Sequence, residues 1–110
     1  MALTKLTTDL IDGSLGTDWQ ATPKTASFTA VAGEGYFVDT TSTAITVTLP
    51  SSPAQGDRVR FFLVSGSNFT VARNGKLING DSSNLTVTTE DAAFEMVFHN
   101  NTYGWRIFTI

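Results

Sequence analysis

The side chains best suited to chemistry in this 110-residue chain are few and scattered. His99 is the single histidine, and a Ser-His-Asp hydrolase would have to use it, yet the sequence has no Gly-x-Ser-x-Gly elbow. One histidine and no cysteine supply too few ligands for a zinc site. Asp81 and the Glu90-Asp91 pair lack the spacing of a calcium-binding loop. We therefore predict a non-enzymatic protein with no catalytic residue, no metal and no cofactor.

Aromatic and amide side chains near the C-terminus form the one candidate ligand surface. Tyr103 follows Asn100 and Asn101, and such a group is able to stack on a sugar ring and to hydrogen-bond its hydroxyls. Trp105 lies two residues further on, and a tryptophan in a strand of a small domain is more often a core residue. We expect Trp105 to be buried and Tyr103 to be exposed. Tyr103, Asn100 and Asn101 are therefore the candidate glycan contacts.

Short strands separated by turn residues must position these groups. Ile45, Val47 and Leu49 alternate with threonines, and Pro50 ends the run. The same pattern recurs along the chain, as is typical of small β folds. It predicts an all-β protein, an antiparallel and jelly-roll-like β-sandwich, with strands near 27–31, 35–40, 43–49, 57–65, 69–73, 76–79, 84–88, 92–99 and 104–110.

Two Asn-Gly pairs mark sharp turns. The pair at 74–75 lies between two apolar runs, and Asn-Gly readily adopts the two positive φ angles of a type I′ turn. It predicts a hairpin that joins 69–73 to 76–78. The second pair, at 79–80, leads into a polar stretch that we expect to be a loop.

The composition excludes several functional classes. The chain has 18 Thr and 9 Ser but only 15% charged residues, a balance that suits extracellular β-rich proteins. A net charge of −3 with scattered basic residues argues against nucleic-acid binding. The sequence has no apolar run that could span a bilayer and no signal-peptide hydrophobic region. We expect a chain that folds in a cytoplasm without disulfides and that binds neither nucleic acid nor membrane.

Residues 1–25 differ in texture from the β-rich remainder at 26–110. Four aliphatic residues occur within nine positions, more than a free tail requires. One interpretation is a flexible leader, and the other is an arm that packs on a neighbour. The second interpretation makes residues 1–25 a docking segment, with four candidate contacts: Leu3, Leu6, Leu10 and Ile11.

The last two expected strands carry apolar side chains on both faces, although a single sandwich has only one interior. The second face is buried against another copy or against the N-terminal arm, or else the final strand is central and covered by a loop. Both interpretations remain open at this point. The first predicts a subunit interface that contains Phe94, Met96, Phe98, Phe108 and Ile110.

The order of these segments resembles a known family. The matching elements are Thr29 to Gly33, Tyr36 with Val38-Asp39-Thr40, Ile45 to Pro50, Gly56-Asp57 and Asn74-Gly75. Over residues 20–110 the chain resembles β-rich modules of tailed-phage virion appendages, the tail-fibre and decoration proteins. It is most similar to those from phages of cyanobacteria and other aquatic bacteria.

This resemblance implies a structural role in a virion. Such proteins are made in the host bacterial cytoplasm and assemble, usually as homotrimers, with other proteins of the capsid or tail. The expected function is a small homotrimeric tail-fibre or capsid-decoration component that attaches through its N-terminal arm. The alternative is a module at a fibre tip that binds a host receptor or a host surface glycan.

Overall fold

The computed structural model describes residues 16–109, and this range contains nine strands and no helix. Eight of the nine predicted strands are present at nearly the predicted positions, whereas the first observed strand was not predicted. The strands are β1 (Asp18–Trp19), β2 (Phe28–Thr29), β3 (Glu34–Asp39), β4 (Ile45–Thr48), β5 (Arg58–Ser65), β6 (Phe69–Ala72), β7 (Leu85–Val87), β8 (Ala93–Asn100) and β9 (Gly104–Thr109).

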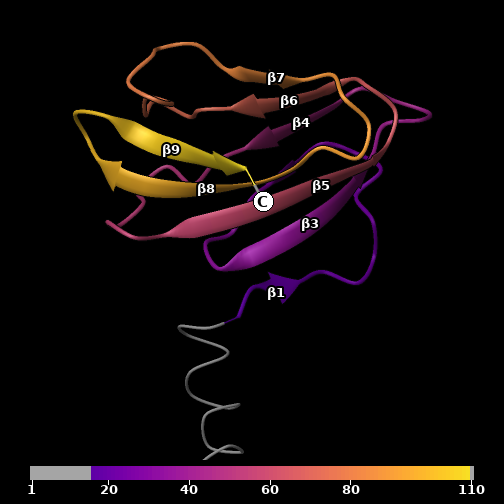
Figure 1. Cartoon of the computed structure of the whole chain (residues 1–110), viewed down its shortest axis with the longest axis horizontal. Helices are drawn as coiled ribbons and strands as arrows, with labels where there is room; N and C mark the ends of the chain where they lie inside the picture. Colours follow the sequence, from indigo (N-terminus) through magenta and orange to yellow (C-terminus); the bar gives the residue numbers. More distant parts are fainter. Residues whose placement is uncertain (1–15, 110) are drawn as a thin grey trace, which may run out of the picture.

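Successive strands alternate between two sheets as far as β6 (Figure 1). The five-stranded sheet has the order β1-β3-β5-β8-β9, and the four-stranded sheet has the order β2-β4-β6-β7. Among β1 to β6, each strand therefore joins the same sheet as the strand two places before it in the chain. As a result β1, β3 and β5 run parallel to one another, and so do β2, β4 and β6. The last three strands then complete the two sheets by antiparallel pairing.

This pairing corrects the predicted antiparallel sandwich. The described strands form four parallel pairs and three antiparallel pairs, so both sheets are mixed. Parallel neighbours need a crossover connection, and here each crossover is a strand of the opposite sheet. The alternation of apolar and polar residues identifies a strand but not the direction of its neighbour. The all-β prediction is confirmed, and the antiparallel pairing is wrong for β1 to β6.

Apolar side chains from both sheets form one core between them. Phe61 of β5 joins the two sheets: its ring centroid lies 5.9 Å from that of Tyr36, 5.6 Å from that of Phe69 and 5.4 Å from that of Phe94. Tyr36 and Phe94 lie in the same sheet as Phe61, whereas Phe69 lies in the opposite one. Trp105 is also fully buried, as predicted.

β1 and Lys24 contribute backbone pairs to the five-stranded sheet. β1 pairs with β3, and the Lys24 backbone forms an isolated bridge with Val38. The Trp19 ring lies over Gly35, where an added Cβ would come within 2.7 Å of it. Part of the segment 1–25, which we expected to be an arm, therefore pairs with the sheet, and the boundary at residue 25 stays a prediction. The four candidate docking residues lie outside the described residues: Leu3, Leu6, Leu10 and Ile11.

The Asn74–Gly75 turn is present, but it does not make the predicted hairpin. Both residues have positive φ angles, 52° and 86°, and the amide of Lys76 donates to the carbonyl of Arg73 at 3.2 Å. The strand expected at 76–79 is absent, and β6 pairs instead with β4 and β7. The local turn geometry was predictable, whereas the partner of β6 was not.

The Asn79–Gly80 turn, expected in a loop, is the one that closes a short hairpin. Its φ angles are 51° and 79°. Ile78 and Asp81 flank it and exchange two backbone hydrogen bonds of 2.9 Å. Ile78 also bridges Trp105 of β9, so this segment lies along the edge of the five-stranded sheet. Backbone groups at that edge, which are otherwise a hazard for aggregation, are thereby paired.

The Tyr36 hydroxyl holds the connection between β2 and β3. It accepts a hydrogen bond from the Val31 amide at 2.8 Å and donates one to the Glu34 carboxylate at 2.7 Å. Burial, followed by the hydrogen bond to Glu34, raises the pKa of Tyr36 well above its ordinary value. The hydroxyl therefore stays protonated and keeps donating across the physiological pH range.

Candidate binding surface on the five-stranded sheet

The side of the five-stranded sheet that faces away from the core carries aromatic and arginine side chains. Alternation along each strand puts every second residue on this side, which we call the outer face. The Trp19 and Phe37 rings stack there with centroids 4.9 Å apart, and the Phe37 and Phe62 rings lie 6.2 Å apart. The outer face includes Trp19, Phe37, Arg58, Arg60, Phe62, Glu95, Val97, Arg106 and Phe108.

One carboxylate on the outer face holds two of its arginines. Glu95 Oε2 lies 2.9 Å from Arg60 Nε and 3.9 Å from Arg58 Nη1. Register explains the arrangement, because Arg60 and Glu95 are directly paired residues of β5 and β8. The Glu95 side chain is only 12% exposed, so this pair is better shielded from solvent than an ordinary surface pair. The cluster therefore fixes the Glu95 carboxylate between β5 and β8.

The predicted subunit-interface residues are divided between the core and the surface. Phe94, Met96 and Phe98 are inward-facing and buried in the core, so they are not available to a partner subunit. This corrects their assignment, because β8 does have two apolar faces but the phenylalanine face is the inner one. Phe108 lies on the outer face and is 51% exposed. Ile110 lies outside the described residues.

Tyr103, the first of the predicted glycan contacts, stands at one end of the outer face. It is 48% exposed, as predicted, and its ring stacks on the His99 imidazole with centroids 5.5 Å apart and planes 12° apart. The Arg106 guanidinium lies over the same ring at 5.7 Å, within cation–π range. His99, Tyr103 and Arg106 line an open hollow of about 320 Å³. An exposed aromatic pair beside a cation is thus already formed in this chain.

The two asparagines differ in what they do. Asn100 Oδ1 accepts hydrogen bonds from the Thr102 and Tyr103 amides, at 3.0 and 2.8 Å, so this side chain shapes the β8–β9 turn. Asn101 is exposed, and its Oδ1 accepts a hydrogen bond from Lys76 Nζ at 3.0 Å. Asn100 therefore helps to position the Tyr103 backbone. Asn101 lies in the same turn and brings a second cation, the Lys76 ammonium, to it.

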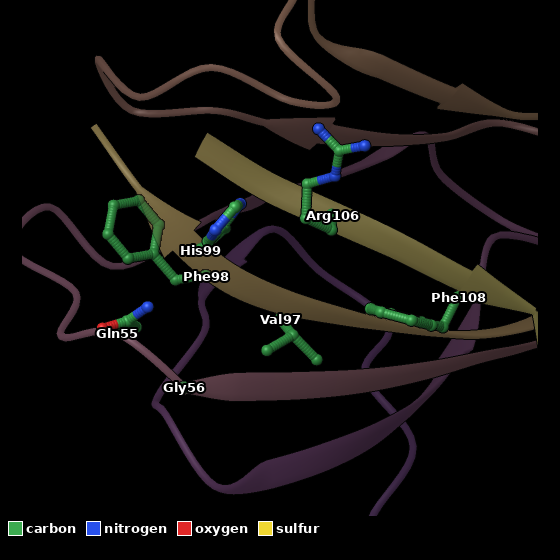
Figure 2. A pocket seen from close by; sticks show the side chains of 7 residues that line it. All are labelled: Gln55, Gly56, Val97, Phe98, His99, Arg106 and Phe108. Carbon is green, nitrogen blue, oxygen red and sulfur yellow. The ribbon is translucent and has the colours of Figure 1, made fainter. Parts of the chain in front are cut away.

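A second hollow of about 380 Å³ adjoins the first along β8 and β9. In Figure 2, His99 and Phe108 lie at opposite ends of it, with Arg106 between them. Val97 lies below this row and Gln55 and Gly56 approach from the loop before β5. The two hollows share His99 and Arg106 as lining residues, and we call the two together the depression; the Tyr103–His99 stack borders the smaller hollow.

Sequence reasoning found Tyr103 but missed Arg106 and the aromatic outer face. The Arg106–Tyr103 contact depends on the irregular register at the end of β8, between Phe98 and Asn100. The sequence did contain a signal for the outer face: in 34–39 and 58–65, the apolar residues Phe37 and Phe62 occupy positions that alternate with the core residues. Residues 16–109 contain no group of three side chains able to bind a metal ion. No helix in this range is long and apolar enough to cross a bilayer.

No protein-family model and no curated protein matches the chain.

Proposed function

We propose that this protein is a non-enzymatic structural component of a phage virion, a homotrimeric tail-fibre or capsid-decoration protein. In this proposal the outer face of the five-stranded sheet packs against the other two copies. Residues 1–25 include the four docking contacts to other virion proteins: Leu3, Leu6, Leu10 and Ile11. The support comes from the resemblance of residues 20–110 to virion appendage modules and from the composition of the outer face.

The composition of the outer face is the single observation that carries this proposal. Aromatic residues and arginine are enriched at protein–protein interfaces, and lysine is depleted there. Trp19, Phe37, Phe62 and Phe108 lie on this face with three of the four arginines of the chain, and it has no lysine. Burial of one exposed phenylalanine stabilises an interface by about 1.5–3 kcal/mol. Phe108 is exposed and Trp19, Phe37 and Phe62 are half-buried, so contact between copies would remove further apolar surface from water.

The mass of the protein in solution tests this proposal. We expect light scattering after size exclusion to give three times the chain mass of 11.8 kDa. Phe108→Asp should shift the protein to the monomer, because it would place a carboxylate in the apolar contact. Val31→Asp is the matched control, since Val31 is equally exposed at 53% but lies in the loop before β3. It should leave the trimer intact.

Two outcomes would contradict the proposal in different ways. A monomeric wild-type protein would contradict the proposal that the protein forms a homotrimer. A Phe108→Asp variant that keeps the trimer mass would instead contradict the proposal that the outer face is the interface between subunits.

A second candidate function is binding of a host glycan. The observation that favours it is the exposed Tyr103 ring, held by His99 on one side and by Arg106. Pockets that bind small molecules combine apolar or aromatic surfaces with a few placed polar groups, and this end of the outer face has both. It lies at the β8–β9 turn, and Figure 2 shows His99 at the opposite end of the larger hollow from Phe108.

A glycan array with Tyr103 variants tests this second function. We expect wild-type protein to bind at least one bacterial surface saccharide. Tyr103→Ala should lower the affinity at least tenfold, since stacking on an aromatic ring is lost. Tyr103→Phe keeps the ring and serves as the control, and it should retain most of the binding. Equal binding by Tyr103→Ala and wild type would contradict this use of the site.

A further inference from the structure

We infer that the saccharide bound at Tyr103 is acidic: a uronic acid unit whose ring covers the Tyr103–His99 stack and whose carboxylate pairs with Arg106. This inference rests on the glycan-binding function proposed above and adds the chemical class of the ligand. It comes from the distribution of charge around the stack.

The charge at this end of the molecule opposes the charge of the whole chain. The chain carries a net charge of −3, yet the groups around Tyr103 are cationic. Arg106 lies over the ring at 5.7 Å, and Lys76 Nζ reaches the same turn through its hydrogen bond to Asn101. A local excess of positive charge in an acidic protein attracts anions and repels cations.

Arg106 differs from the other outer-face arginines in its partners. Arg58 and Arg60 approach the Glu95 carboxylate, whereas Arg106 pairs with no carboxylate in residues 16–109 and contacts the Tyr103 ring. A guanidinium presents a planar fork of donors that matches a carboxylate with two parallel hydrogen bonds. Arg106 is exposed and lines both hollows. Its donors are therefore available to a ligand that rests on Tyr103.

Glu95, on the same face as Arg106, is paired with Arg60 and Arg58, and two further acidic residues, Asp57 and Asp81, follow residues that meet this end of the molecule. Asp57 follows Gly56 of the larger hollow, but its carboxylate accepts a hydrogen bond from the Ala54 amide at 2.9 Å, within its own turn. Asp81 is exposed in the hairpin that begins at Ile78. Neither residue lines the depression, so a ligand carboxylate meets Arg106 without an acidic side chain in the lining.

Titration calorimetry with two oligosaccharides of equal length tests the inference: an oligogalacturonate and the corresponding neutral galacto-oligosaccharide. We expect wild-type protein to bind the acidic sugar at least tenfold more tightly than the neutral one. Arg106→Gln should remove that preference, and Arg106→Lys should restore only part of it, because an ammonium lacks the bidentate fork. Raising the salt concentration from 0.05 to about 0.5 M should weaken acidic binding, since exposed charges are then screened.

Lys24→Gln is the control for net charge, because Lys24 bridges Val38 in β3, away from the β8–β9 turn. It removes one positive charge and should leave the preference intact. Equal binding of both sugars would overturn the acidic ligand, and a preference that survives Arg106→Gln would overturn the pairing of its carboxylate with Arg106. Either result leaves glycan binding in place. Absence of binding to either sugar here, together with no hit on the glycan array, would overturn both.

Discussion

Phe61→Ala is expected to lower the free energy of unfolding by about 3–5 kcal/mol, the usual loss for a buried aromatic residue that is truncated to alanine. Phe61 is fully buried, and its ring contacts aromatic rings in both sheets: Tyr36 and Phe94 in its own sheet and Phe69 in the other. The substitution leaves a cavity where the two sheets meet. Neighbouring strands fix the flanking backbone, so the cavity closes only in part.

Such a loss is a large share of the roughly 5–15 kcal/mol that stabilises a typical domain. Urea denaturation at one fixed protein concentration measures it, and thermal unfolding should shift by roughly 4–8 °C for each kcal/mol. Val31→Ala is the control, because the Val31 side chain is 53% exposed and surface changes cost about 0.5 kcal/mol or less. A Phe61→Ala variant as stable as Val31→Ala would mean that Phe61 does not connect the sheets.

Gly104→Ala is expected to destabilise the protein by about 2–5 kcal/mol. Gly104 has a φ of +75°, which costs a residue with a side chain about 1–2 kcal/mol. An added Cβ would also overlap the backbone carbonyl of Leu77, and overpacking of this kind costs a further 1–3 kcal/mol or so. The overlapped atom belongs to the backbone, so it cannot rotate away. The same carbonyl accepts a hydrogen bond from the Trp105 amide at 2.8 Å, and this contact should be lost.

Gly75→Ala separates the two contributions to that loss. Gly75 has a similar φ of +86°, but an added Cβ would meet nothing within 4 Å. This control should therefore show the cost of the backbone conformation alone, about 1–2 kcal/mol. Equal losses for the two variants in urea denaturation would show that the approach of Leu77 to β9 contributes nothing to stability.

The positions of most strands were predictable because alternation of apolar and polar residues within a few positions indicates a strand. Ile45 and Val47 are buried while Thr46 is exposed, as the period of two requires. β1 was missed because no alternation of apolar and polar residues surrounds it in the sequence, and Trp19 is held by contacts with Gly35 and Phe37. Gly35 and Phe37 belong to β3, and no local pattern in residues 16–25 predicts contacts with that strand.

The candidate site was predictable only in part. Tyr103 was expected to be exposed because it lies between turn residues, and it is. Phe94 and its neighbours were assigned to a subunit interface although they lie in the core. Alternation shows that a strand has two faces, but it does not say which one meets the opposite sheet. The outer face, with Phe37 and Arg106, became visible only once the strands were paired.

The sequence by itself determined the all-β class, the approximate strand positions, the two Asn-Gly turns and the burial of Trp105, because these depend on residue type and on periodicity within a few residues. The tertiary structure alone decided the parallel pairing of β1 to β6, which face of β8 is buried, and the contacts of Tyr103 with Arg106 and with His99. Each of these joins residues from different strands. Register and direction between strands come from the packing of the whole chain, and a local pattern does not contain them.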